Sequence, residues 1–138
     1  MGIKSPSSAS STARDLEAAL KAAADPTRLR ILALLAPGPL CVCQIATVLG
    51  TSQPATSRHL ALLRRAALID AERRGQWVWY RRPAAPARSS RAALLAWIDR
   101  SLAADSGARR DRAALRSPRI RALVAACPLP RVSRARRA

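Results

Sequence analysis

The spacing of the apolar residues changes along this chain of 138 residues, from helical to strand-like near residue 67 and then back again. Apolar positions recur every three or four residues in four successive segments, which predicts helices at about 15–23, 26–36, 41–49 and 53–66. Two β-prone runs follow, 68–73 and 76–81, and the Arg74-Gly75 pair between them is typical of a hairpin turn. A fifth helix is expected over about 89–104. This pattern predicts a mainly helical domain with one small hairpin.

Signals for helix ends separate these segments. Asp25-Pro26 and Thr51-Ser52 are typical of helix starts, and Gly50 is typical of a helix end. The helices 41–49 and 53–66 are therefore joined by a short turn, whose glycine lets them meet at a steep angle. Two helices joined by a short turn and followed by a hairpin occur in this order in a winged helix-turn-helix.

The length is sufficient for one domain with additional segments. Residues 1–13 are small and polar and are expected to form a disordered leader. Residues 14–104 are expected to form the winged helix-turn-helix domain, and 105–138 a basic C-terminal extension. Within that extension Gly107 is expected to end the fifth helix, and Ser117-Pro118 to begin a last helical segment.

The charge of the chain restricts its partners. Twenty-five Lys and Arg residues against eight Asp and Glu residues give a formal net charge of +17. A polyanionic partner is expected, because each neutralised phosphate releases condensed counterions. Nucleic acid is the first expectation and an anionic membrane surface the lesser one, although a GC-rich genome would also enrich Arg and Ala. We expect no membrane span, no secretory signal and a cytoplasmic location.

Polar residues gather at the start of the helix 53–66, the end that enters the major groove in this fold. Amide, hydroxyl and guanidinium groups can hydrogen-bond base edges or phosphates, and the hairpin tip can reach the adjacent backbone. A merely solvated helix face is the alternative, but fold order and charge favour DNA. The residues expected to contact DNA are Ser52, Gln53, Thr56, Ser57, Arg58, His59, Arg73 and Arg74.

The single histidine and two tryptophans have plainer expectations. His59 is expected to pack or to contact a phosphate, not to bind a metal ion. Trp77 and Trp79 are two residues apart, so their side chains share one face of the predicted strand. We expect them to pack the hairpin against the helices, with stacking on bases as the alternative.

Cys41 and Cys43 stand at a predicted helix start. In a regular helix residues two apart point to different sides, but Cys41-x-x-Gln44 has the spacing of a capping box, which places Cys41 outside the helix. The helix N-terminus is expected to lower the thiol pKa, and thiolates select soft ions. Fraying one turn would bring both sulfurs onto one ion. The pair predicts a metal or metalloid sensor, with a dithiol redox switch or simple packing as alternatives.

Other function classes fit less of the sequence. A nonspecific nucleoid-type DNA binder would account for the charge but not for the dithiol. A small thiol enzyme would account for the dithiol alone, and no glycine-rich phosphate loop, carboxylate pair or histidine-backed nucleophile is visible. We therefore expect neither an enzyme nor a catalytic cofactor.

Four segments resemble the arsenical-resistance repressors of the ArsR/SmtB family: residues 40–45 (LCVCQI), 52–60 (SQPATSRHL), 63–68 (LRRAAL) and 74–80 (RGQWVWY). The resemblance covers roughly residues 14–104. It implies a homodimer that represses resistance operons and leaves its operator DNA when As(III) or Sb(III) binds. It also implies that Cys41 and Cys43 are the inducer ligands and that Gln53 to His59 form the DNA-reading helix. Cys127, or a small thiol such as glutathione, would supply a third ligand; a buried structural role for Cys127 is the alternative.

This sequence departs from the family pattern at three places. Gln44 stands where an acidic residue is usual, Leu40 where a glutamate is frequent, and Ala46 where some members have a further cysteine. The Cd(II)- or Pb(II)-sensing branch adds N-terminal cysteines, and none precedes Cys41, which favours the metalloid. That branch and a dithiol redox-responsive repressor remain alternatives. The Asp/His site of the zinc- and nickel-sensing branch is not expected, because the fifth helix offers Asp99 without a histidine.

Overall fold

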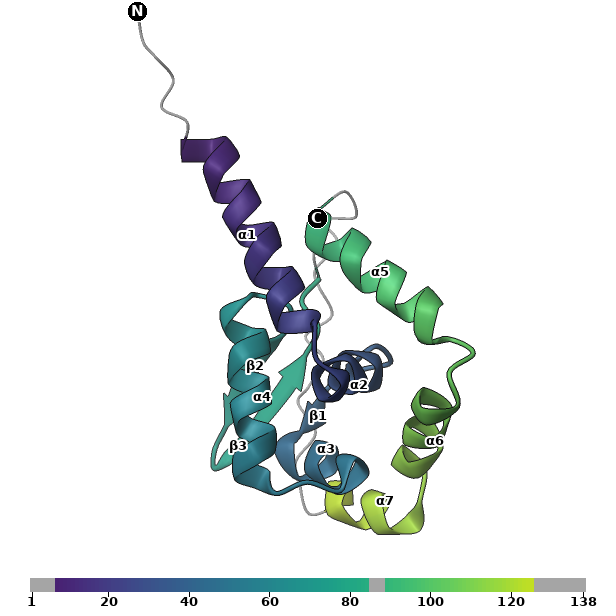
Figure 1. Cartoon of the computed structure of the whole chain (residues 1–138). Coiled ribbons are helices and arrows are strands. Elements are labelled where there is room, and N and C mark those ends of the chain that lie inside the picture. The colour runs from purple at the N-terminus through teal and green to yellow at the C-terminus, as the bar shows by residue number, and fades with distance from the viewer. Residues whose placement is uncertain (1–6, 85–88, 126–138) are drawn as a thin grey trace, which may run out of the picture.

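The computed structural model describes residues 7–84 and 89–125, which form seven helices and three short strands in the order of a winged helix-turn-helix (Figure 1). The mainly helical fold with a hairpin is therefore confirmed. The elements are α1 (Ser7–Ala23), α2 (Pro26–Leu35), β1 (Leu40–Cys41), α3 (Val42–Leu49), α4 (Gln53–Arg65), β2 (Asp70–Arg74), β3 (Trp77–Arg81), α5 (Ser90–Leu102), α6 (Ser106–Leu115) and α7 (Pro118–Ala125). No described helix is long and apolar enough to cross a bilayer.

The helix ends lie where the capping residues predict them. The side chain of Asp25 accepts a hydrogen bond from the Arg28 amide at 3.0 Å, and Pro26 occupies the first turn of α2. Ser89 caps α5 in the same way, through the Ala92 amide at 3.1 Å. Each cap satisfies a backbone N–H that the helix itself leaves without a partner.

The three strands form one antiparallel sheet in the order β1-β3-β2. The predicted hairpin is β2–β3, and Gly75 adopts a positive φ of 59° in its turn. The strand β1 was not predicted, since two residues are too short to show an alternating pattern. It places Cys41 opposite Trp79.

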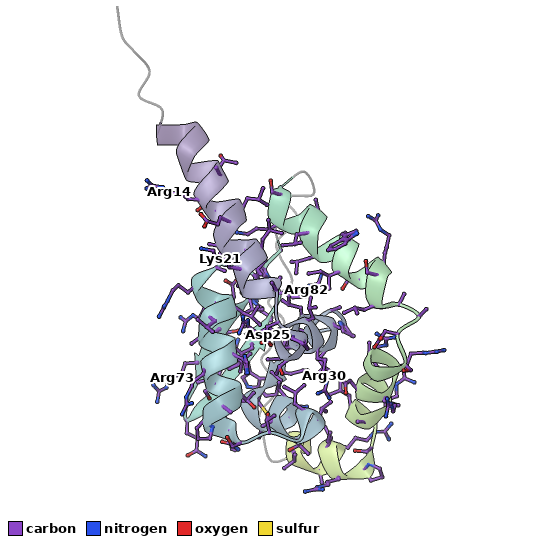
Figure 2. The ribbon with its side chains drawn as sticks, in the orientation of Figure 1. Arg14, Lys21, Asp25, Arg30, Arg73 and Arg82 are labelled. Carbon is purple, nitrogen blue, oxygen red and sulfur yellow. The ribbon has the colours of Figure 1, made fainter. Side chains whose placement is uncertain are left out.

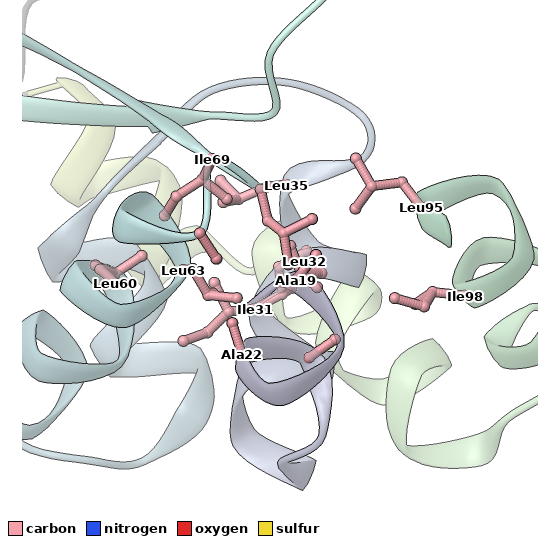
Figure 3. Close-up of a cluster of buried hydrophobic side chains, with 14 of the residues drawn as sticks. Ala19, Ala22, Ile31, Leu32, Leu35, Leu60, Leu63, Ile69, Leu95 and Ile98 are labelled. Atoms are coloured by element: carbon pink, nitrogen blue, oxygen red, sulfur yellow. The ribbon is translucent and has the colours of Figure 1, made fainter. Parts of the chain in front are cut away.

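The core consists mainly of Ala, Leu and Ile side chains, and the chain has no Phe. Figure 3 shows α1, α2, α4 and α5 converging on it. Ile31 and Leu32 on α2 and Leu60 and Leu63 on α4 are fully buried. The largest buried side chain outside this cluster is Trp79, which packs with Cys41.

Two helices differ from the prediction. The helix α1 begins at Ser7, inside the segment expected to be a leader, because Ser and Ala there include no helix breaker. Gly107 does not end the fifth helix: α5 already ends at Leu102, and Gly107 lies in the first turn of the additional helix α6, which Asp105 caps. The last helix begins at Pro118 as predicted. Cys127 lies outside the described residues.

Candidate nucleic-acid interface and dithiol site

The turn between α3 and α4 is held by glycine and by hydroxyl groups. Gly50 ends α3 in the left-handed conformation, with φ 68°, which a side chain would strain. Ser52 caps α4 by accepting a hydrogen bond from the Ala55 amide at 3.2 Å. These residues fix the angle at which α4 leaves α3.

The prediction that α4 exposes Thr56 is wrong. Thr56 is completely buried, and its hydroxyl donates to the Ser52 carbonyl at 2.9 Å and lies 2.8 Å from the Thr51 hydroxyl. Thr56 thus closes the turn and does not face a ligand. Its spacing of four and seven residues from the buried Leu60 and Leu63 is the sequence signal for this burial.

Four of the remaining candidates on α4 and its cap are exposed: Ser52, Gln53, Ser57 and Arg58. Sequence reasoning missed Arg64 and Arg65, which are also exposed and line a shallow hollow with Ser57 and Tyr80. Their signal was the spacing of seven residues from Ser57 and Arg58, which keeps them on the same side of the helix. The outer face of α4 is therefore polar and uncharged at its start and basic at Arg58, Arg64 and Arg65.

His59 lies at the inner edge of α4 and is half-buried. Its Nδ1 atom is 3.3 Å from Nη1 of Arg28 on α2. Because a guanidinium can only donate, the imidazole nitrogen accepts this hydrogen bond. Arg28 also donates from Nε to the Ala22 carbonyl and lies 3.8 Å from a carboxylate oxygen of Asp25. His59 thus ties the reading helix to the α1–α2 corner, which agrees with the expected packing role.

The two arginines at the hairpin tip have different surroundings. Arg73 is exposed at the outer edge of the hairpin (Figure 2), and its Nε donates to the Gly75 carbonyl at 3.2 Å. Arg74 is half-buried and forms an ion pair with Glu72 at 2.8 Å. Arg73 is therefore the better placed of the two to reach a phosphate.

The two sulfurs of the dithiol lie together. Cys41 precedes α3 in an extended conformation, with φ −86° and ψ 162°, and its amide donates to the Gln44 side chain at 2.9 Å. The predicted capping box is thus confirmed. Because Cys41 lies outside the helix, its Sγ is only 2.6 Å from Sγ of Cys43. No fraying of the first turn is needed to bring the sulfurs together, so that expectation was wrong.

The expected lowering of the thiol pKa does not hold for Cys43. Its pKa is raised to about 11, first by burial and then by the hydrogen bond and the charge of Cys41. Burial penalises the thiolate more than the backbone amides of the helix start stabilise it. Cys43 is therefore a neutral thiol at neutral pH.

Trp79 forms one wall of this site. It faces Cys41 across the β1–β3 pair, and the two side chains are 2% and 1% exposed. Cys43 and Trp77 pack against them. The expectation that the tryptophans pack the hairpin against the helices is thus confirmed for Trp79. Its Nε1 is buried and has no hydrogen-bond partner among the described residues.

The described residues supply only two ligands of this kind at the dithiol. Across 7–84 and 89–125 no group of three His, Cys, Asp or Glu side chains is placed to hold a metal ion. Asp99 on α5 is already engaged, because Arg82 donates to both of its carboxylate oxygens at 2.8 and 2.9 Å.

Comparison with known proteins gives consistent results. The family model described as "Bacterial regulatory protein, arsR family" matches residues 25–71. The "Arsenical resistance operon repressor" of Escherichia coli (strain K12) is 48% identical over 79 residues, which are 56% of this chain and 68% of that protein. The "Arsenic resistance transcriptional regulator ArsR1" of Pseudomonas putida is 52% identical over 62 residues, 44% of this chain and 48% of that protein.

A solved structure has the same fold. It is the homodimeric winged helix-turn-helix DNA-binding domain of Mb0332 from Mycobacterium bovis, described as a possible ArsR-family transcriptional regulator. The TM-score is 0.57 at 27% identity, and the match covers 77% of this chain and 92% of that one.

Proposed function

This chain belongs to the ArsR family of bacterial regulatory proteins, which are transcriptional regulators and not enzymes, and we propose that it is a repressor released from operator DNA by As(III) or Sb(III). In this proposal Cys41 and Cys43 bind the inducer in the cytoplasm. The outer face of α4, from Ser52 to Arg58, reads the operator, and Arg73 contacts the adjacent backbone. The exposure of Ser52, Gln53, Ser57, Arg58 and Arg73, which offer hydroxyl, amide and guanidinium groups, supports the assignment.

The observation that carries the proposal is the 2.6 Å separation of the two sulfurs at the start of α3. Two adjacent thiols on one side of a helix start are a preformed soft-ligand pair. The pair is sheltered by Trp79 and Trp77, which exclude water from a bound ion. Thiolate–metal bonds are about 2.3 Å long, so two sulfurs on one tetrahedral centre stand about 3.7 Å apart. Binding must therefore spread the sulfurs.

The protonated state of Cys43 favours the metalloid over a divalent cation. A neutral thiol condenses with As(OH)3: its S–H proton leaves with an arsenic-bound hydroxide as water, so the As–S bond forms without release of a proton or transfer of electrons. A divalent cation must instead displace protons from thiols, and the raised pKa of Cys43 makes that costly.

Moving the two sulfurs apart is expected to displace both elements that read DNA, namely α4 and the hairpin β2–β3. Cys43 lies in the first turn of α3, which packs on α4. Cys41 pairs with Trp79 in β3, one strand of the hairpin. A site that opens between them displaces α3, β3 or both. The inducer then favours the DNA-incompetent state, and operator DNA weakens inducer binding to the same degree.

We propose that the repressor is a homodimer joined through α1 and α5, which pack on each other in one protomer. Large apolar side chains are exposed on these helices: Leu16 at 40%, Leu20 at 49% and Trp97 at 60%. A second protomer would cover them, and two α4 helices would then meet half-sites about one DNA turn apart.

The test is fluorescence anisotropy of a labelled duplex from upstream of the chain's own gene, titrated with arsenite, antimonite and cadmium. We expect near-stoichiometric arsenite or antimonite to weaken operator binding by about 150-fold, which corresponds to a coupling of roughly 3 kcal/mol. The variant C41S/C43S should bind the operator and ignore the inducer. The matched control C127S keeps both sulfurs; if it responds only with added glutathione, Cys127 is the third ligand.

Three other outcomes would contradict the proposal. Release of C41S/C43S by arsenite would show that the inducer site lies elsewhere. Release by cadmium alone would place the chain in the divalent-metal branch. Operator binding that is indifferent to all three ions, but lost on mild oxidation, would make the dithiol a redox switch.

A further inference from the structure

The C-terminal helices α6 and α7 are part of the folded domain. Both pack on α3, and α6 also packs on α2. Ala108 on α6 and Ile120 on α7 are buried at 3% exposure each, and Leu115 packs against the main core. The side chains of α6 and α7 are therefore held at fixed positions relative to the helix-turn-helix.

Both acidic residues of the segment 105–125 accept hydrogen bonds from other groups of the protein. Asp111 is buried and accepts two hydrogen bonds from Arg30 of α2, each 2.8 Å long. Asp105 caps α6 by accepting from the Ala108 amide at 2.8 Å. Asp111 therefore does not offset the charge of the outer surface, whereas Asp105 is exposed and offsets one positive charge at the start of α6.

That outer surface is basic. The same segment contains six arginines, of which Arg112 is half-buried. The five exposed ones are Arg109, Arg110, Arg116, Arg119 and Arg121. A rigid surface with five exposed arginines and one exposed carboxylate, that of Asp105, matches an extended polyanion better than a compact ligand.

The position of α7 identifies the polyanion. Figure 1 shows α7 beside α3, at the end of the molecule where the α3–α4 turn lies. We propose that α7 forms a second DNA-binding surface, which contacts the phosphates of the duplex flanking the half-site read by α4. This inference rests on the proposed function, because it assumes that α4 binds DNA.

The test compares the salt dependence of DNA binding in two full-length variants. R119Q/R121Q removes two charges from α7 in each protomer, whereas R14Q/K21Q removes two exposed charges from α1, away from α7 (Figure 2). Each phosphate contact contributes about 0.9 to the slope of log K against log [salt]. We expect R119Q/R121Q to lower the slope by about 1.8 for each protomer, hence by about 3.6 for the homodimer, on operator and unrelated duplexes alike. The control should leave the slope unchanged.

Flanking DNA gives a second measurement. An operator fragment trimmed to the half-sites should bind wild type and R119Q/R121Q equally, whereas a fragment with flanking base pairs should favour wild type. An unchanged slope in R119Q/R121Q, with a native circular dichroism spectrum, would overturn the inference and leave the repressor proposal intact. Failure of the wild type to prefer its operator would overturn the repressor proposal, and the slope on unrelated DNA would still decide the role of α7.

Discussion

The helix-turn-helix contains two helix starts that are closed by different chemistry. At the start of α4, the hydroxyls of Ser52 and Thr56 satisfy backbone groups with hydrogen bonds of 3.2 and 2.9 Å. At the start of α3 a glutamine amide does so, and two thiols lie beside it. The oxygen-capped start has no affinity for a soft ion, whereas the sulfur-bearing start has it without giving up its cap.

The difference shows how one motif can be both rigid and responsive. One half of the capping box, the hydrogen bond from the Cys41 amide to the Gln44 side chain, uses no sulfur and can persist when the sulfurs bind a ligand. In α4 the buried Thr56 is needed, because it joins the turn to the first turn of the helix. A ligand can therefore displace the start of α3 while that of α4 stays intact.

The largest predicted effect is the dependence of cadmium affinity on pH, compared with that of arsenite affinity. The pKa of Cys43 is about 11, so its thiol is protonated between pH 6 and 8. Cadmium must release that proton, and its affinity should rise up to about tenfold per pH unit for each proton displaced. Arsenite condenses with neutral thiols, so its affinity should change by less than about threefold. Isothermal titration calorimetry in buffers of different ionisation enthalpy measures the protons released.

The matched control for the pH prediction is C43S. This variant should bind cadmium weakly, and its cadmium affinity should no longer depend on pH. An arsenite affinity that rises as steeply as that of cadmium would contradict the prediction, because both thiols would then bind only after losing their protons.

A smaller effect is expected at the oxygen-capped start. T56V keeps the shape of the side chain but removes a buried hydroxyl with two partners. We expect the free energy of unfolding to fall by about 2 kcal/mol, since a buried hydrogen bond is lost and its partners are left less satisfied. The neighbouring S57A should change it by less than about 0.5 kcal/mol, because Ser57 is exposed. Urea denaturation followed by circular dichroism measures both.

The smallest effect is expected at the cap of α3. Gln44 is 4% exposed and accepts the Cys41 amide. Q44A should lower the free energy of unfolding by about 1 kcal/mol, through loss of the cap. Q53A, at the exposed first position of α4, is the matched control and should leave stability unchanged. If Q44A unfolded like wild type, the sulfurs themselves would have to hold the start of α3.

Most of the fold could be predicted from local signals. Asp25, Ser52 and Ser89 cap helices, and Gly50 ends one, because these properties depend on a few neighbouring residues. The capping box at Cys41 could be predicted for the same reason. The burial of Thr56 was also visible in its spacing to Leu60, although its hydroxyl suggested a surface role.

The rest depends on residues far apart in the chain. The raised pKa of Cys43 reflects burial beside the hairpin, which its neighbours in sequence do not reveal. The ion pair of Arg30 with Asp111 spans 81 positions and anchors α6, so no periodicity could indicate it. The start of α6 was hidden by Gly107, whose usual role as a helix breaker was misleading at a first turn.

The pairing of Cys41 with Trp79 also gives the protein a built-in optical signal. The indole is 2% exposed and packs against the thiol, so a heavy atom bonded to that sulfur would lie against the ring. Heavy atoms shorten the excited-state lifetime of an indole, so the intrinsic emission of Trp79 would be quenched on loading. Trp97 is 60% exposed and lies on another element, and its emission would serve as the internal reference. Occupancy of the site would thus be measurable without a label, in the presence or absence of DNA.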